Sequence, residues 1–537
     1  MLIQGELLRA DYGFTRANSD FGMMRGIAPS SEMNFLGLFY NRCHLNLSVI
    51  KAVAARVPGG SASEFERREG GEEEAWRPTP RNLLALPALL RKVISKGLST
   101  PREADALAEE MDARLAESHQ RDYESLPYLE ILQGLEEGRD HLFQAMAMHI
   151  TVSQFALIYH LFLCRLTGEW LGDGDGTLAS RLMTGLQSLE SARPSALIWD
   201  LSRMVLESAS LESIFRENDA AEIMELLEAS PSEEAGSFLD SLHAFLAEYG
   251  YRGVFEAETM LPSWGEDPSY VFSMILNYLE ADAASDPRDL AARQDRERED
   301  ALREMERRLK GARLSILKYV LKQAQQFISL REFMKSYLIK GISHAKKVYR
   351  VLGRRYCEDG VIAVPEDIYF LTRAEITEIA GGGELPVEEL VSRRRSEYER
   401  NLKVTLPLYS RGRPVPLTPE ELEPLEDIET LTGIGVSPGE VTGTARVITD
   451  PRSNAEIKPG EILVAPVTDA AWTPLFVTAA ATVVDVGGPL SHGSIVAREF
   501  GIPCVVNAGN ATRIIRNGQL ITVDGSRGKV YLHPVEK

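Results

Sequence analysis

A change of hydrophobic pattern near residue 433 constrains the fold of this 537-residue chain more than any other feature. Up to about residue 375, apolar residues recur at three- and four-residue spacing, for example over 139–166 and 297–356, which predicts amphipathic helices. After Gly433 the chain consists of short β-rich runs bounded by Gly, Pro and Asp, with one helical piece at 493–500. We therefore expect a multidomain protein of α plus α/β class, in which a small mixed domain follows a large helical one.

The segment between the two parts is rich in proline. Because proline fixes φ and lacks an N–H donor, this segment is expected to be a semi-rigid linker; its prolines are Pro407, Pro414, Pro416, Pro419 and Pro424. The predicted domains are residues 1–400, the linker 401–432 and the C-terminal domain 433–537. Within the helical part, the segment 361–372 (VIAVPEDIYFLT) is β-branched and aromatic and is expected to form a short strand or an ordered loop.

Composition and charge exclude several classes of protein. The formal net charge of −20 argues against a binder of nucleic acid or of anionic membranes. Residues 433–537 hold nine acidic and nine basic side chains, so residues 1–432 carry the whole acidic excess. The cysteines form no CxxC pair, which fits idle thiols in a reducing cytoplasm and no zinc site; they are Cys43, Cys164, Cys357 and Cys504.

No stretch of the chain predicts a membrane segment. The N-terminus meets charge too early for a signal peptide. The most apolar stretch, 150–164, is fifteen residues long and contains Gln154 and His160, so a core helix is the better interpretation. We therefore expect a cytoplasmic protein.

The segment 487–503, GGPLSHGSIVAREFGIP, carries the chemistry. It places His492 between a predicted strand and a short helix. Glycines allow a sharp turn and give an anion close access, and the first turn of a helix offers unpaired N–H groups. A neutral imidazole is nucleophilic near pH 7 and can form a covalent intermediate. Taken alone, such a segment also fits an ordinary helix-capping turn in which His492 only packs.

The extended segment resembles the phosphohistidine signature of the family that includes pyruvate phosphate dikinase, phosphoenolpyruvate synthase and rifampicin phosphotransferase. The resemblance covers about residues 433–532 and includes TDAAWTPLF at 468–476 and VDGSRGKVYL at 523–532. Leu490 stands where the dikinase branch usually has Thr, which looks more like the rifampicin phosphotransferase branch. The resemblance implies a swivelling β/β/α domain in which His492 carries the phosphoryl group. Its implied phosphate-binding residues are Gly487, Gly488, Ser491, Gly493, Ser494 and Arg498.

The helical part holds a second candidate site on a predicted helix. Arg331 and Lys335 are four residues apart and share one helix face, and Glu332 is within pairing reach of Lys335. Residues 301–356 contain fifteen Lys or Arg against three Glu, and fixed cations stabilise phosphoryl transfer. Such a run is also typical of a solvated helix face. The weaker resemblance of this part to rifampicin phosphotransferase implies that Arg331 and Lys335 hold the phosphoryl group, and that Glu332 orients or deprotonates an acceptor.

Around a second stretch of the same resemblance, Arg252 and Glu256 are expected at the edge of the substrate site. No metal site is predicted. The sequence shows no glycine-rich phosphate loop, so ATP and Mg²⁺ are expected on a separate ATP-grasp subunit that phosphorylates His492. The leading hypothesis is a phosphotransferase component that passes the group to a hydroxyl of a small molecule bound in the helical domain. The alternatives are a phosphohistidine relay without its own acceptor and a non-catalytic scaffold.

Overall fold

A computed structural model describes most of the chain. The described residues are 36–40, 42–45, 80–174, 176–186, 193–281, 286–407, 410, 412–418, 428–452 and 457–534. They divide into two compact units: residues 1–158, 258–260 and 334–417 form one, and residues 159–257, 261–333 and 418–537 form the other. This division by compactness is not a division into the three regions predicted from the sequence, and those domain boundaries stay a prediction.

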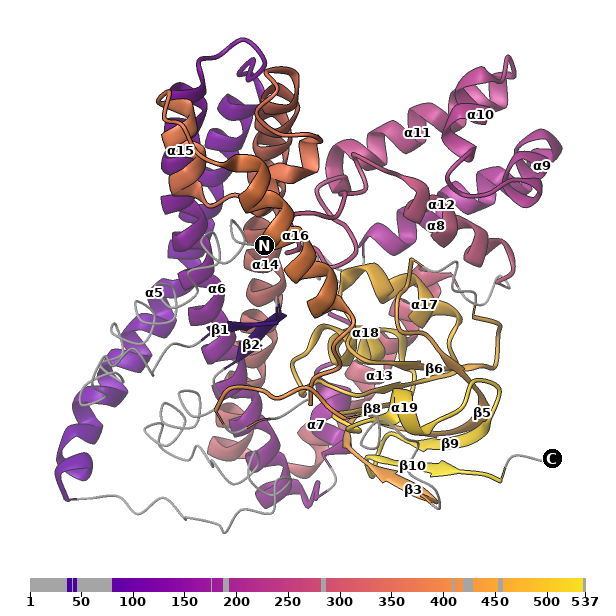
Figure 1. The fold of residues 1–537 in the computed structure, drawn as a ribbon. Coiled ribbons are helices and arrows are strands. Elements are labelled where there is room, and N and C mark those ends of the chain that lie inside the picture. The colour runs from indigo at the N-terminus through magenta and orange to yellow at the C-terminus, as the bar shows by residue number, and fades with distance from the viewer. Residues whose placement is uncertain are drawn as a thin grey trace. The chain divides into compact units, whose positions relative to one another are not determined.

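The first unit is helical (Figure 1). Its elements are the hairpin β1 (Leu36–Phe39) and β2 (Arg42–Leu45), α5 (Pro80–His119), the first part of α6 (Tyr128–Leu171), the second part of α14 (Gly311–Glu358), the 3-10 helix η2 (Pro365–Phe370), α15 (Arg373–Ala380) and α16 (Val387–Leu402). A capping box begins α15: the Thr372 hydroxyl accepts from the Glu375 N–H, and the Glu375 carboxylate accepts from the Thr372 N–H. Glu375 also binds Arg394 of α16, which ties the two helices together.

The segment 361–372 forms η2 where the sequence allowed a strand or an ordered loop. Pro365 occupies the start of this 3-10 helix, where a missing N–H is tolerated. The Asp367 carboxylate accepts from the Val364 N–H, which closes the turn. The apolar residues that suggested a strand are instead buried on the inner side of the turn; Ile368, Tyr369, Phe370 and Leu371 are each at most 4% exposed.

Helix α6 is the one described helix that is long and apolar enough to cross a membrane by length and composition alone. Its most apolar window is 39% buried within the structure. The core helix of a globular protein meets the same criteria. The predicted core segment 150–164 lies inside it.

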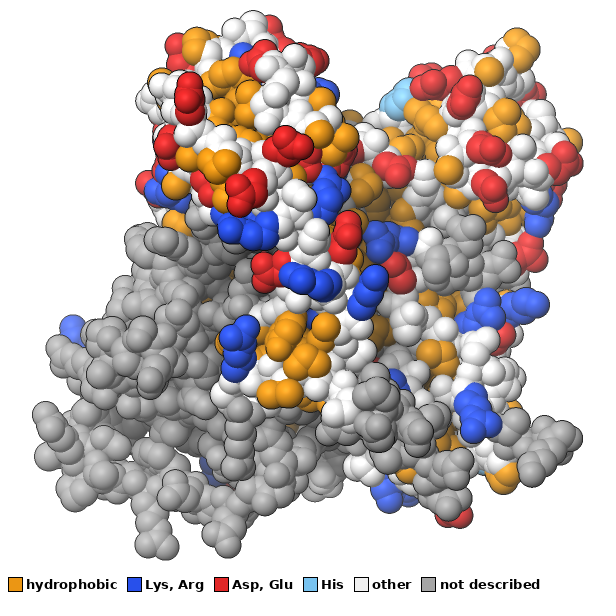
Figure 2. All heavy atoms as spheres, viewed as in Figure 1, with side chains coloured by type: hydrophobic (Ala, Val, Ile, Leu, Met, Phe, Trp, Pro, Cys, Tyr) orange, Lys and Arg blue, Asp and Glu red, His pale blue; other side chains and the backbone are white. Residues whose placement is uncertain are grey.

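The second unit contains helices from the middle of the chain and the whole C-terminal sheet (Figure 1). The helices are α7 (Thr177–Leu182), α8 (Arg193–Leu206), α9 (Ala209–Glu217), α10 (Ile223–Ala229), α11 (Glu233–Tyr249), α12 (Ser269–Leu279), α13 (Pro287–Arg308) and the first part of α14. The exposed faces of α9–α11 are crowded with carboxylates, visible in red in Figure 2. These include Glu217, Asp219, Glu222, Glu225, Glu228, Glu233, Glu234 and Asp240. This face carries part of the acidic excess and is unsuited to nucleic acid.

Eight strands form one mixed sheet in the order β3-β10-β9-β5-β6-β7-β8-β4. The central strands β5 to β8 run parallel and the flanking ones pair antiparallel. Their bounds are Thr430–Thr432, Ile434–Ser437, Glu440–Val447, Ile462–Ala465, Ala481–Val484, Cys504–Val506, Leu520–Asp524 and Lys529–Leu532 for β3 to β10. The helices η4 (Ala470–Trp472), α17 (Thr473–Thr478), α18 (His492–Phe500) and α19 (Ala511–Ile514) complete the domain. A mostly helical chain with a small C-terminal α/β domain confirms the predicted fold class.

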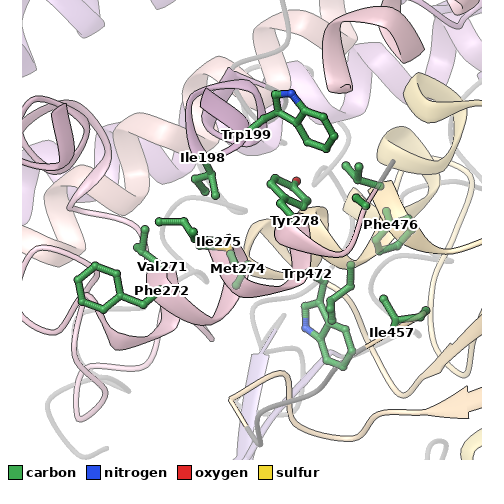
Figure 3. Packing of buried hydrophobic residues seen from close by; sticks show 14 of the residues in the cluster. Ile198, Trp199, Val271, Phe272, Met274, Ile275, Tyr278, Ile457, Trp472 and Phe476 are labelled. Carbon is green, nitrogen blue, oxygen red and sulfur yellow. The ribbon is translucent and has the colours of Figure 1, made fainter. Parts of the chain in front are cut away.

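One apolar cluster joins the helices of the second unit to its sheet domain (Figure 3). Trp199 and Tyr278, from α8 and α12, belong to the same cluster as Trp472 and Phe476 of the sheet domain. All four are at most 3% exposed. A hydrogen bond from the Tyr270 hydroxyl to the Ala471 carbonyl, 2.7 Å long, adds a directional contact. The sheet domain is thus seated on α12 through its η4–α17 segment.

Candidate active site

Side chains of α18 hold the preceding loop by donating hydrogen bonds to the loop's backbone carbonyl groups. The Ser494 hydroxyl donates to the Gly488 carbonyl at 2.7 Å, and the Arg498 guanidinium donates to the Pro489 carbonyl at 2.7 Å. Both donors lie on α18 and reach back to the loop. Together they fix the bend from which His492 begins the helix.

Two glycines of this segment face different surroundings. A Cβ added to Gly493 would lie 2.2 Å from the Thr468 hydroxyl oxygen and 3.3 Å from the ring of Phe476. A Cβ added to Gly488 would meet nothing within 4 Å. Gly493 is therefore required for the close packing of α18 against the 468–476 segment, whereas Gly488 borders open space.

The imidazole of His492 is held from two sides. Its Nε2 lies 3.1 Å from the hydroxyl oxygen of Thr473, the first residue of α17. Its Nδ1 lies 3.5 Å from a carboxylate oxygen of Glu332 on α14. The side chains of His492 and Glu332 are only 5% and 2% exposed. The ring therefore occupies a nearly closed seat, in which a carboxylate faces one nitrogen and a hydroxyl faces the other.

Glu332 belongs to a buried group of charges. Its other carboxylate oxygen pairs with the guanidinium of Arg331. Arg252 and Glu256 form a second ion pair, with 3.1 Å between Nη1 and Oε1, and both side chains are at most 4% exposed. Burial by itself would lower the pKa of Arg252, but the negative charges of Glu256 and Glu332 outweigh it, so that its pKa is raised. Arg252 is thus a fixed cation in the electrostatic surroundings of Glu332.

The predicted site residues therefore fall into distinct groups. His492, Glu332 and Arg331 come together, and Arg252 and Glu256 are buried nearby as an ion pair. Lys335 follows on α14 but belongs to the other compact unit. No group of three His, Cys, Asp or Glu side chains suited to a metal occurs among the described residues.

Three of the predicted phosphate-binding side chains, those of Ser491, Ser494 and Arg498, make hydrogen bonds at the loop that precedes α18. The Ser491 hydroxyl lies 2.9 Å from that of Ser494 and makes no capping hydrogen bond to the helix. Backbone N–H groups of the first turn of α18 are therefore not capped by this side chain, which suits an anion. Arg498 is 4% exposed, and burial lowers its pKa. Its observed contact braces the loop, and a direct phosphate contact stays a prediction.

Sequence reasoning missed Thr473 and Thr468. Both lie in the segment 468–476, which was noticed as part of the resemblance without a role for any residue. The signal available was a helix start, TP at 473–474, because proline at the second position of a helix marks where it begins. Nothing in the sequence alone indicated that this helix start faces His492.

An open cavity of about 650 Å³ lies in the same unit. It is lined by Gly185, Leu186, Asp295, Arg298, Lys322, Gln325, Gln326, Ser329 and Leu330. Lys322, Gln325, Ser329 and Glu332 follow one another at spacings of three, four and three residues, so they lie along one face of α14. Ser329 is therefore one helical turn from Glu332. This stripe leads from the cavity towards the carboxylate that contacts His492.

Comparisons with known proteins agree with this geometry. Residues 457–528 match the PEP-utilising enzyme mobile domain, and residues 148–332 match the rifampicin phosphotransferase fourth domain. The C-terminal domain is thus similar to the mobile domain of PEP-utilising enzymes, and the middle of the chain is similar to a domain of rifampicin phosphotransferase. The two matches include His492 and Glu332, respectively, the residues that the structure brings together.

Several curated relatives are longer than the chain. The prodigiosin synthesizing transferase PigC of Serratia marcescens is 32% identical over 68% of this chain and 41% of its own length. The uncharacterized phosphotransferase YvkC of Bacillus subtilis is 30% identical over 67% and 44%. A rifampicin phosphotransferase of Streptomyces sviceus is 32% identical over 55% and 34%. The chain thus spans less than half the length of each of these relatives.

Proposed function

We propose that this chain is a phosphotransferase component in which His492 carries a phosphoryl group to a hydroxyl of a small organic acceptor. The contact that supports this proposal most directly is the 3.5 Å approach of His492 Nδ1 to Glu332, beside Arg331. Phosphoryl transfer needs a reactive imidazole, a carboxylate and a guanidinium in one site that is largely closed to water. The names of the relatives as phosphotransferases point the same way.

The two ring nitrogens have different surroundings, which favours Nε2 as the phosphorylated atom. A phosphoryl group on Nδ1 would place its negative charge against the Glu332 carboxylate. Nε2 lies 3.1 Å from the neutral hydroxyl of Thr473. On this proposal Glu332 binds the N–H at Nδ1 and orients the ring.

Transfer then breaks the bond between phosphorus and Nε2 and forms a bond between phosphorus and the acceptor oxygen. The hydroxyl proton passes to Glu332, and the imidazole is released as a neutral ring that keeps its proton on Nδ1, 3.5 Å from that carboxylate. The guanidinium of Arg331 offsets the charge on the phosphoryl oxygens. We propose the same role for Lys335, the next basic residue along α14.

The open cavity beside Ser329 favours an acceptor transferase over a relay, because a relay needs no small-molecule site. Lys322 and Gln326 line the cavity and have no hydrogen-bonding or ionic partner among the described residues. They are free to bind a polar, hydroxyl-bearing acceptor. We further propose that ATP and Mg²⁺ bind to a separate ATP-grasp subunit, which phosphorylates His492. We propose that the reaction takes place in the cytoplasm.

Loading of His492 requires the mobile domain to leave the seat seen here, because its ring is nearly closed off from solvent. The test incubates the full chain with labelled ATP and the proteins of neighbouring genes, and maps any acid-labile label. We expect label in the wild type and in His533→Ala, a histidine of the same domain remote from the motif, and none in His492→Ala. Label that persists in His492→Ala would refute the proposal.

Discharge is tested separately from loading. Arg331→Ala and Lys335→Ala are expected to accept label at the wild-type rate and to retain it when a cell extract of small molecules is added. Wild-type protein that passes its label only to other proteins would identify a relay instead.

A further inference from the structure

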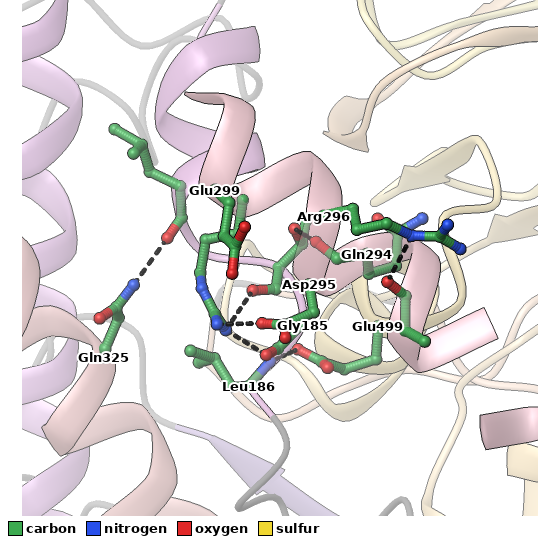
Figure 4. A network of polar contacts seen from close by, with 12 residues as sticks. Gly185, Leu186, Gln294, Asp295, Arg296, Glu299, Gln325 and Glu499 are labelled. Carbon is green, nitrogen blue, oxygen red and sulfur yellow. Dashed lines mark hydrogen bonds and ion pairs between the residues drawn. The ribbon is translucent and has the colours of Figure 1, made fainter. Parts of the chain in front are cut away.

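The last turn of α18, at the opposite end of the helix from His492, carries Glu499. Figure 4 shows Glu499 beside the 184–186 segment and α13. The carboxylate of Glu499 accepts a hydrogen bond from the Leu186 N–H, with 3.2 Å between the atoms. Glu499 is only 5% exposed. Because Glu499 and His492 are seven residues apart on one helix, a contact at Glu499 fixes the direction in which His492 points.

Two glycines allow the close approach at this contact. Gly501, with φ of 67°, ends α18, and a Cβ there would lie 1.9 Å from the side-chain amide of Gln294 on α13. Gly185, with φ of 61°, precedes Leu186, and a Cβ there would lie 2.6 Å from the backbone of Asp295. Both positive φ values are readily adopted by glycine. The fit of the mobile domain against α13 and the 184–186 segment is therefore specific in shape.

Three charged groups surround Glu499. Arg298 of α13 donates to the Gly185 carbonyl and to Asp295, which braces the 184–186 segment. Arg498 is the neighbour of Glu499 on α18. Burial raises the pKa of Glu499 to about 7; the Leu186 N–H, Arg298 and Arg498 act against this rise, and Asp295 adds to it.

We propose that Glu499 is a positioning residue that docks the mobile domain on the 184–186 segment and α13, so that His492 meets Glu332. This inference rests on the proposed function, because docking has a purpose only if His492 delivers a group there. It also predicts that docking responds to the protonation of one carboxylate.

The direction of the pH dependence follows from the two states of Glu499. When the domain leaves its seat the carboxylate is exposed, and its pKa returns towards the ordinary ~4.3. Docking therefore takes up a proton, and the docked state is favoured as the pH falls through about 7. For a docked pKa of about 7, lowering the pH from 8 to 6 raises the docking equilibrium constant about tenfold.

Hydrogen–deuterium exchange of the full chain tests this inference without any phosphoryl donor. The readout is the protection factor, corrected for intrinsic exchange, of the peptide that contains the Leu186 amide, measured between pH 6 and 8.5. The variants are Glu499→Gln, which keeps an acceptor oxygen without a charge, and Glu299→Gln on α13 as the control. Glu299 pairs with Arg303 at the surface and has no contact with Glu499 among those described.

The wild type and the Glu299→Gln control are expected to gain about tenfold protection between pH 8 and pH 6. Glu499→Gln is expected to be protected at pH 8 and to lose the pH dependence. Wild-type protection that does not change with pH, or the same pH dependence in Glu499→Gln, would overturn the inference. The wild-type profile is informative even if the variant misfolds. Loss of label on His492 with intact pH-dependent docking would refute the proposed function alone.

Discussion

The close packing around Gly493 predicts that alanine at this position destabilises the second unit, and Gly488 in the same segment offers a control position. In Gly493→Ala the new methyl group would lie 2.2 Å from the Thr468 oxygen and 3.3 Å from the Phe476 ring. Alanine gains up to ~1 kcal/mol of helix propensity over glycine. Overpacking of a well-filled core costs ~1–3 kcal/mol. Because 2.2 Å is far inside van der Waals contact, we expect steric strain to outweigh the gain in helix propensity. The free energy of unfolding of the second unit should fall by about 1–2 kcal/mol.

The assay is calorimetric unfolding of the full chain, in which the transition of the second unit is followed. Gly488→Ala is the matched control, because its methyl group would meet nothing within 4 Å. Thr468→Ala removes the clashing oxygen, so the double variant Thr468→Ala/Gly493→Ala should recover part of the loss. A coupling of about 1 kcal/mol between the two positions is expected for residues in contact. If Gly493→Ala unfolds like the wild type, the reasoning about this contact is wrong.

Two further predictions concern the seat of His492. Thr473→Val is expected to slow phosphoryl transfer by up to about tenfold, because a hydrogen bond of ~0.5–1.5 kcal/mol no longer stabilises Nε2 as the phosphoryl group leaves it. Thr478→Val on the same helix removes a hydroxyl that has no hydrogen-bond partner in the described chain, and it should leave transfer unchanged. Glu256→Ala is expected to destabilise the second unit by about 3–5 kcal/mol, measured by chemical unfolding, because it removes the carboxylate that pairs with the buried Arg252 guanidinium. A loss below ~1 kcal/mol would show that Arg252 is solvated in a way that its 3% exposure does not suggest.

Hydrophobic periodicity was sufficient to predict the fold class, because helices and short buried strands differ in the spacing of their apolar residues. It left a strand and an ordered loop as alternatives at 361–372, where four consecutive apolar residues are buried by a 3-10 turn. Local sequence also gave no sign that residues 159–257 and 261–333 form one compact unit with the sheet domain. That arrangement depends on contacts between residues more than a hundred positions apart.

The site was predicted in part. His492, Arg331 and Glu332 were identified from motif and spacing, and they meet in the structure. The hydroxyl of Ser494 and the guanidinium of Arg498 bind carbonyl groups of the loop, and their expected contact with phosphate stays a prediction. A sequence states which donors are present in a segment, but the direction in which each side chain points is decided by the backbone around it.

The apolar contact of Trp472 and Phe476 with α8 and α12 has a consequence for the cell. If the mobile domain leaves this position to be loaded, as proposed above, two large aromatic rings and the helix surfaces that cover them become exposed to water together. Such surfaces attract other apolar surfaces, including those of a second copy of the chain. Such a chain would stay free of aggregation only if the undocked state is short-lived or if its exposed apolar surface is covered by another protein. The donor subunit proposed above would then be expected to offer an apolar docking surface.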